Sequence, residues 1–453
     1  MKRLRPHAFL ILLMVGAEGS GPVLAAPDPA PVPPITVPDR LDLKMAIGFA
    51  LANNFAIREA RERIKQQEGV VLEVRGKSIP NVVAQGLYQE NSTSISPTFP
   101  ASTTFWQGSV IATQTLYAGG GVRSSIRNAN LTREAAALDL QATINQALLD
   151  VRTRFYNVLL AREKIRVQEE NIGLLKSQLK DASDRFETGT TSSFDKLRAD
   201  VALANGQVPL ITARNDFRIA VEQLRQSLGF ASQRSGDLQK VPEFDGVLTY
   251  TSASFDLAAC LEAAHANRPE LQRLAKEREA GEQSVVTARS NYYPNLALAG
   301  GWEAEKAPFA LSGSSSSSVN GWRIGLQSQW NIFDGASTSG RVAQARSLLQ
   351  QAKLTLDEQT LAIDVEVRQA YSAWQEADEL AAATQKTVGQ AEESLRLATA
   401  RYEAGAATHL DVLQAQVDLT QARVNQVQAD YTDTVALAQL REAMGMADDY
   451  SVN

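Results

Sequence analysis

The chain has few of the residues on which most enzymes and metalloproteins depend. Its 453 residues include one cysteine, Cys260, and three histidines, two of which, His265 and His409, lie beyond the N-terminal segment. A single cysteine excludes a disulfide framework and a multi-cysteine zinc site. The histidines have no second ligand at a spacing that suits a metal, so they are interpreted as structural or solvated. We therefore expect no catalytic residues, no metal and no cofactor.

Aromatic residues, basic charge and long apolar runs are also scarce. Aromatic side chains make up 6 % of the chain, which favours long helices over a thick core. Lysine and arginine number 45 against 51 acidic residues, a net charge of −6. A strongly basic protein that binds nucleic acid is therefore excluded as the first interpretation of this sequence. Beyond the N-terminus no stretch approaches 18 consecutive apolar residues, so we expect no membrane-spanning helix.

The N-terminal segment has the pattern of a secretory signal. Basic residues at positions 2, 3 and 5 precede a short apolar run from Phe9 to Val15. This run is much shorter than the ~20 residues of a membrane-spanning helix, although an N-terminal membrane anchor is the alternative. We predict a signal peptide over residues 1–25. Six of the twelve residues from 27 to 38 are proline, so residues 26–40 are expected to form an extended linker.

The rest of the chain is a tandem duplication. Residues 185–229 and 401–445 align without a gap, and fifteen of the 45 positions are identical. Glycines and prolines stay in register between the two copies, which chance resemblance of two helical segments would not produce. The two repeats therefore span 41–229 and 255–445. Residues 230–254 connect them, and residues 446–453 form a tail.

Each repeat is predicted to start with two short helices and to continue with two strands, because the apolar period changes from 3.6 to 2 after a proline. The short helices are expected at 41–52, 54–78, 255–266 and 269–290, and the strands at 80–93, 104–117, 294–305 and 321–333.

The last of these strands has the clearest alternation. Trp322, Ile324 and Leu326 share one face, while polar residues and glycine occupy the other. An apolar face of this length matches a transmembrane β-strand, which needs roughly 9–11 residues. Trp322 and Trp330 lie near its two ends and would suit an aromatic girdle in the membrane interface. The alternative is a soluble antiparallel sheet with one buried face.

Two helices of unusual length follow the strands. Residues 119–186 and 336–402 contain no proline and are rich in strong helix formers. A helix of this length would measure roughly 100 Å at 1.5 Å per residue. Gly189 and Gly405 suit the left-handed position that ends a helix. Return helices are then expected at 193–228 and 409–444, with Asp195 and Asp411 in their first turns.

Four strands cannot close a barrel, and open sheet edges are not tolerated in lipid. Symmetry-related copies must therefore complete the sheet, with eight strands from two chains or twelve from three. The predicted fold is mostly α with a transmembrane β-barrel portion built by several copies.

These features together resemble the TolC family of outer-membrane efflux and secretion channels, over nearly the whole exported chain. The resemblance rests on the two Arg-(Phe/Tyr)-Glu-x-Gly…Asp-x-Leu repeats and on the strand-to-helix junctions at 116–120 and 332–336. It implies a homotrimer with a 12-stranded β-barrel, a long α-helical barrel and a mixed equatorial domain. It also implies a location in the outer membrane of a Gram-negative bacterium, with a periplasmic extension and contact with membrane lipid.

The resemblance further implies passive conduction, opened and powered through a periplasmic adaptor and an inner-membrane pump of the RND or ABC type. Neither the pump type nor the cargo follows from the sequence. A periplasmic coiled-coil adaptor or structural protein is one alternative, and it would need no apolar strand faces. A trimeric surface adhesin is the other, although the duplication is unusual there.

Family members close the periplasmic end through polar contacts at the helix tips. Tyr402, Gly405 and Asp411 fit the archetypal Tyr-x-x-Gly-x-Arg…Asp-x-x-Asp segment. Ala407 and Gln414 replace the archetypal arginine and second aspartate, so the latch must lack its usual cation.

By resemblance, Asp195 matches the acid that meets the tyrosine, and Asp411 would line the closed aperture. The alternative is that both acids only stabilise helix N-termini. The tip turns at Gly189, Thr190, Gly405 and Ala407 are expected to dock the adaptor.

Overall fold

The computed structural model describes residues 38–90, 92, 94, 104–230, 241–250, 252–306 and 318–446. The predicted signal peptide, most of the linker, most of the two strand-to-strand loops and the tail from residue 447 lie outside the described residues. The chain divides into two units, and the helices and strands belong to the unit formed by Arg40–Ala231 and Glu243–Asn453. Within the described residues, no helix combines the length and the apolarity needed to cross a membrane.

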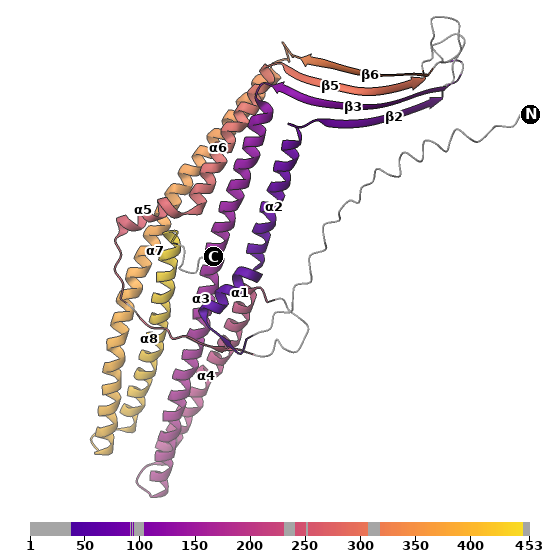
Figure 1. Ribbon diagram of the computed structural model, residues 1–453. Coiled ribbons are helices and arrows are strands. Elements are labelled where there is room, and N and C mark those ends of the chain that lie inside the picture. The colour runs from indigo at the N-terminus through magenta and orange to yellow at the C-terminus, as the bar shows by residue number, and fades with distance from the viewer. Residues whose placement is uncertain are drawn as a thin grey trace, which may run out of the picture. The chain divides into compact units, whose positions relative to one another are not determined.

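The long helices form two hairpins (Figure 1). In the first repeat α3, Gly121–Glu187, packs against α4, Ser193–Leu228. In the second repeat α7, Ser337–Glu403, packs against α8, His409–Ala443. The long helices α3 and α7 each have 67 residues. Because α3 and α7 follow strands at one end and reach turns at the other, the sheet and the hairpin turns lie at opposite ends of these helices.

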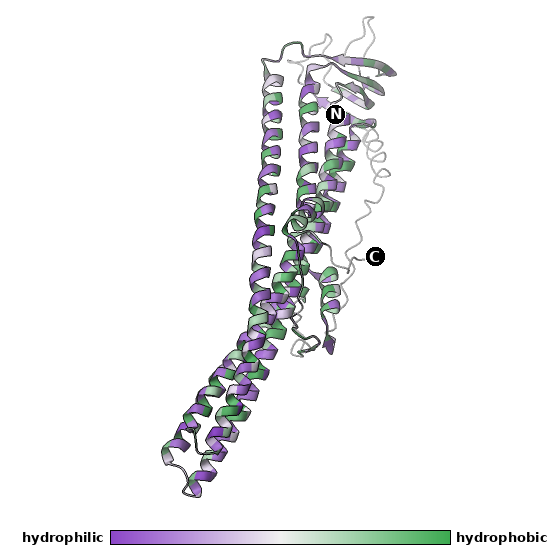
Figure 2. Cartoon of the chain, turned by 90° about the vertical axis from the view of Figure 1, so that its left-hand side faces the viewer, coloured by the Kyte–Doolittle hydropathy of each residue, from purple (hydrophilic) through white to green (hydrophobic). Residues whose placement is uncertain are grey.

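Shorter helices line the upper part of the hairpins in the view of Figure 1. Helix α2, Phe55–Gly76, packs on α3, and α6, Pro269–Arg289, packs on both α3 and α7. They are preceded by α1, Leu43–Asn53, and α5, Leu257–Asn267. Figure 2 shows hydrophilic and hydrophobic residues interleaved along all of these helices.

The four long strands form one antiparallel sheet in the order β2-β3-β5-β6. Their bounds are Asn81–Glu90, Thr104–Ala118, Asn295–Lys306 and Ser318–Gln329. The last strand differs from the predicted range 321–333, because it begins and ends earlier. Gln329 pairs with Asn295, the first residue of β5, and Pro294 before it has no N–H to donate. Trp330 therefore lies beyond the sheet.

A second, two-stranded sheet corrects the predicted end of the linker. Strand β1, Arg40–Leu41, pairs in parallel with β4, Glu243–Phe244. Arg40 therefore belongs to the folded unit, and its Nε lies 3.2 Å from a carboxylate oxygen of Glu243. This pairing ties the connector between the repeats to the start of the first repeat.

The duplication recurs in the packing. One core cluster includes Val151 of α3 with Leu224 and Leu228 of α4. The other includes Val367 of α7, Leu440 of α8 and Met444, which follows α8; these are the positions 216 residues further along the chain. Cys260 is buried in this second cluster, where burial raises the pKa of its thiol, so it packs rather than reacts.

Two repeated glycines allow a close backbone approach at the ends of α4 and α8. Gly229 has φ +74°, and a Cβ atom there would lie 2.4 Å from the carbonyl oxygen of Asn53. Gly445 has φ +66°, and its Cβ would lie 2.9 Å from the backbone nitrogen of Arg268. Only glycine combines this φ with this proximity, which explains the identity of the two positions.

Candidate functional site

The turns at the ends of the two hairpins are built in the same way. Gly189 and Gly405 both have positive φ, +73° and +74°. After Gly189, the N–H of Thr190 donates to the carbonyl of Arg185 at 2.9 Å. After Gly405, the N–H of Ala406 donates to the carbonyl of Arg401 at 2.7 Å. These bonds form the Schellman pattern, which satisfies the last carbonyls of each long helix. Thr190 is exposed, and Ala407, two residues beyond Gly405, is half-buried.

Asp195 and Asp411 both lie in the first turn of the helices that follow, three residues after the capping residues Ser192 and Thr408. The Asp411 carboxylate accepts hydrogen bonds from the backbone N–H and the hydroxyl of Thr408, both at 2.8 Å, in a capping box. The Asp195 carboxylate accepts from the hydroxyls of Ser192 at 2.7 Å and Thr191 at 3.0 Å. These bonds favour the charged form and lower the pKa of both carboxyl groups.

Stabilisation of the two helix N-termini therefore accounts for the contacts that Asp195 and Asp411 make within one chain. Asp411 is also exposed, so a capping role leaves its charge available to solvent. Gln414, one turn further along α8, donates to the Asp418 carboxylate at 2.9 Å on the exposed face of the helix.

Tyr402 meets different partners from those implied by the resemblance. Its ring centroid lies 5.6 Å from that of His409, and the Arg185 guanidinium lies 4.9 Å from the same Tyr402 ring. Arg185 comes from the first hairpin, whereas Tyr402 and His409 come from the second. We call these three side chains the tip stack. His409 is buried, which fits a structural histidine better than a solvated one. His265 is exposed, and its Nε2 lies 2.6 Å from a carboxylate oxygen of Asp364.

The sequence contained only a weak signal for the tip stack. Arg185 is repeated at Arg401, which marked it as part of the motif but not as a partner of Tyr402. His409 replaces Ser193 of the first repeat, and its burial depends on a contact between segments far apart in the chain.

Aromatic residues pair across the strands on the apolar face of the sheet. Trp322 lies directly opposite Trp302, and Tyr88 directly opposite Trp106. Tyr88 and Trp106 are near the loop ends of β2 and β3, whereas Trp302 and Trp322 lie near the middle of β5 and β6. Trp330, beyond β6, donates its indole N–H to the carbonyl of Tyr292 at 3.1 Å, at the end of the sheet nearest the helices. Trp330 thus lies just beyond the helix end of the sheet, whereas Trp322 lies near its middle, because β6 begins at Ser318 and not at the predicted residue 321.

The other face of the sheet carries polar and charged groups. Glu303 accepts a hydrogen bond from the amide of Gln107 on β3. Glu303 also lies 3.4 Å from the guanidinium of Arg323 on β6, measured from carboxylate oxygen to Nη1. The sheet therefore has one aromatic and aliphatic face and one face suited to water.

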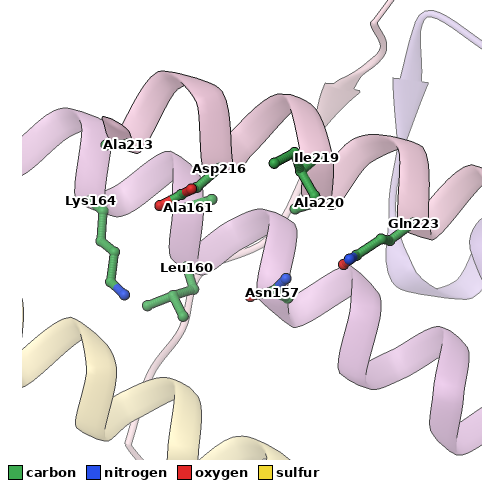
Figure 3. A pocket seen from close by; sticks show the side chains of 9 residues that line it. All are labelled: Asn157, Leu160, Ala161, Lys164, Ala213, Asp216, Ile219, Ala220 and Gln223. Atoms are coloured by element: carbon green, nitrogen blue, oxygen red, sulfur yellow. The ribbon is translucent and has the colours of Figure 1, made fainter. Parts of the chain in front are cut away.

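Among the described residues, the grooves between the helices do not bring together the side chains of a catalytic site. One groove of about 250 Å³ lies between α3 and α4 (Figure 3). Its polar side chains are spread along the two helices, and the ammonium of Lys164 donates to Gln428 at 2.8 Å. In the part of the chain that the structure describes, no group of three or more His, Cys, Asp or Glu residues could hold a metal ion.

Comparison with known proteins gives one consistent result. The profile of the outer membrane efflux protein family matches residues 46–230 and 260–446. The cobalt-zinc-cadmium resistance protein CzcC of Cupriavidus metallidurans is 24 % identical over 402 residues, covering 87 % of each chain. Protein CyaE of Bordetella pertussis is 26 % identical over 436 residues, covering 94 % of this chain and 88 % of CyaE.

Solved structures share the fold. A structure of CusC superposes with a TM-score of 0.75 at 18 % identity, covering 89 % of this chain and 92 % of that one. The Campylobacter jejuni CmeC outer membrane channel superposes with a TM-score of 0.75 at 16 % identity, covering 91 % and 87 % of the two chains. These matches confirm the TolC-type architecture of long helices and a β portion. Since the family profile covers both repeats, this chain belongs to the outer membrane efflux protein family and is an outer-membrane protein of the TolC type.

Proposed function

We propose that the chain is one protomer of a homotrimeric channel that crosses the outer membrane and extends into the periplasm. The observation that carries this proposal is the exposed apolar face of the sheet. Trp322, Ile324 and Leu326 are 79 %, 66 % and 68 % exposed in the single chain. Lipid would cover this face, and three copies of the four strands would close a barrel of twelve.

The exposed face of α4 supports the same assembly. Phe194, Leu197, Val201, Val208 and Ile211 are each at least half exposed. Their spacing of three, four and seven residues places them on one stripe of the helix, as in a helix that packs against another. A neighbouring protomer would cover this stripe, so that the hairpins of three copies form a helical tube.

The channel would conduct passively and carry no catalytic site. An inner-membrane pump, acting through a periplasmic adaptor, would supply energy and select the cargo. The names of the relatives include a cobalt-zinc-cadmium resistance protein and an alkaline protease secretion protein. Metal or drug efflux and type I protein secretion are therefore both compatible classes, with a pump of the RND or ABC type.

The hairpin turns are the proposed periplasmic gate, with three copies of Asp411 around the aperture. We expect the purified full-length protein to need detergent and to form ion channels in planar bilayers. Replacing Asp411 by asparagine keeps a capping oxygen but removes the charge, so cation selectivity and block by divalent ions should weaken. Single-channel recording of reversal potentials measures this. Asp418→Asn, an exposed change of equal charge on the same helix, is the control.

Absence of conductance from every preparation would contradict the channel. Unchanged selectivity and block in Asp411→Asn would instead contradict only the placement of Asp411 at the aperture.

The same turns are the proposed adaptor docking site. Thr190→Cys and Ala407→Cys place one thiol in each turn, and Cys260 is buried, so a thiol-specific crosslinker should react mainly at the new site. In cells, both variants are expected to capture the adaptor. Glu68→Cys, on the exposed surface of α2, is the matched control. Equal capture at Glu68→Cys, or none at the turns, would argue against this docking site.

A further inference from the structure

A buried histidine lies at the contact between the two hairpin tips. His409 is the first residue of α8 and is 8 % exposed. Its Nδ1 is buried and has no hydrogen-bond partner among the described residues. Buried polar atoms without a partner are rare, because the free-energy cost of removing such an atom from water is not offset by a hydrogen bond within the protein. The position of His409 therefore needs a reason beyond packing.

The contacts of His409 connect the two hairpins. Its ring is 5.6 Å from the Tyr402 ring, with 54° between the ring planes. Arg185 of the first hairpin covers the same Tyr402 ring at 4.9 Å and also forms an ion pair with Asp181 at 3.0 Å. A cation over an aromatic face is attracted by the ring quadrupole. The tip stack thus joins α3 to α7 and α8.

Charges of both signs surround His409. Asp181 and Arg185 approach from α3, and Asp195 and Arg198 approach from α4. Tyr402 approaches from α7. Burial is the main influence and lowers the pKa of His409; the two arginines act in the same direction, and the two aspartates oppose them. In the packed tips, the imidazole is consequently neutral near pH 7.

We propose that neutral His409, stacked on Tyr402 beside Arg185, is the positioning residue that holds the two hairpin tips together, and that protonation of His409 releases them. The tip stack would replace the latch cation that is missing at Ala407. This inference rests on the proposed function as a gated channel. It adds to that function a closed state that responds to mild acidity.

The sign of the pH dependence follows from the burial. The neutral imidazole is favoured when the tips are packed, whereas an exposed imidazole has a pKa near 6.5. The packed state therefore keeps its full stability above about pH 6.5 and loses it as the pH falls below that value. The ratio of released to packed tips would rise by up to about tenfold per pH unit in each protomer.

The test records opening frequency in planar bilayers for the full-length protein between pH 7.5 and pH 5.5. We expect openings of the wild-type channel to become more frequent over this range, by up to about tenfold for the release of one protomer's tips. His409→Phe keeps a buried aromatic ring that cannot take up a proton, so its openings should stay rare and independent of pH. His409→Leu is a second apolar variant, for use if phenylalanine does not fit. His265→Gln should respond to pH like the wild type.

Further measurements separate failure of the His409 proposal from failure of the proposed channel function. Arg185→Gln removes the cation from the stack and should raise the opening frequency already at pH 7.5. A pH response that survives in both His409→Phe and His409→Leu, or a wild type whose openings do not depend on pH, would overturn the inference while leaving the channel intact. A protein that never conducts would contradict the proposed function instead.

Discussion

Replacing Arg268 by alanine is expected to destabilise the second repeat by about 3 kcal/mol, the low end of the cost of breaking a buried ion pair, because the change leaves three partly buried carboxylates without their cation. The Arg268 side chain is 6 % exposed. Its guanidinium makes two hydrogen bonds to Glu366, at 3.0 and 3.1 Å, and it also bonds to the carbonyl oxygen of Glu442 at 3.3 Å. Its Nε lies 3.1 Å from Glu270.

The position of Arg268 explains why so many partners meet there. Arg268 precedes the first residue of α6, and its backbone lies against Gly445 at the end of α8. Burial opposes the charge of Arg268, but Glu442, Glu270 and Glu366 outweigh it and raise the pKa of the guanidinium. Burial also raises the pKa of Glu442, against the influence of Arg268. Without Arg268, the Glu442 carboxylate would lose the positive charge that offsets the cost of its burial.

Thermal unfolding of the detergent-solubilised protein, followed by circular dichroism, measures the effect. Arg396→Ala is the control, because Arg396 also pairs with a glutamate but on the exposed surface of α7. Surface ion pairs contribute little to stability, so this variant should unfold like the wild type. Equal melting temperatures for Arg268→Ala and Arg396→Ala would show that the buried cluster does not stabilise the repeat.

Replacing Asp433 by asparagine is expected to stabilise the protein at pH 8 by about 3 kcal/mol, since each unit of pKa shift corresponds to about 1.4 kcal/mol. Asp433 lies on α8 and is 3 % exposed. Burial, followed by the nearby charges of Asp378 and Asp430, raises its pKa from 3.8 to about 6. The hydroxyl of Tyr250, in the connector between the repeats, donates to the Asp378 carboxylate at 2.9 Å and so holds Asp378 close to the connector.

The gain should depend on pH in a defined direction. The folded chain binds the Asp433 proton more tightly than the unfolded chain does. The wild type is therefore most stable, with respect to this group, below about pH 3.8, and it loses this stability as the pH rises through about 6. The advantage of Asp433→Asn should accordingly be large at pH 8 and nearly absent at pH 4.

Melting temperatures at these two pH values test the direction. Asp418→Asn, an exposed change of the same charge on the same helix, should alter stability little at either pH. A stabilisation by Asp433→Asn that is equal at pH 4 and pH 8 would contradict a raised pKa as its cause.

Much of the fold follows from local patterns. The return helix predicted at 193–228 occupies Ser193–Leu228, because Ser192 caps its start and Gly229 ends it. The long helices begin and end within about two residues of the predicted positions, since strand-to-helix glycines and Schellman turns mark their limits. These signals act over one or two turns of chain, which is why a single sequence displays them.

The strand ends and the tip contacts did not follow from local patterns. The alternation of apolar residues continues to Ile332, but β6 stops at Gln329 because its partner strand stops. The motif implied that Tyr402 meets Asp195, yet Asp195 accepts from its own turn and Tyr402 lies between Arg185 and His409. In each case the outcome depends on which distant residue occupies the available space.

The duplication, the helical hairpins, the apolar sheet face and the family could all be predicted from the amino-acid sequence, because each depends on the spacing and type of residues along the chain. The burial of particular polar side chains could not be predicted in this way: Arg268 and Asp433 in the second repeat, and His409 at the hairpin tips, are removed from water by the folded chain. Burial is a property of segments that meet in space. Arg185 and His409 are 224 positions apart, so no local pattern could show that they share the Tyr402 ring.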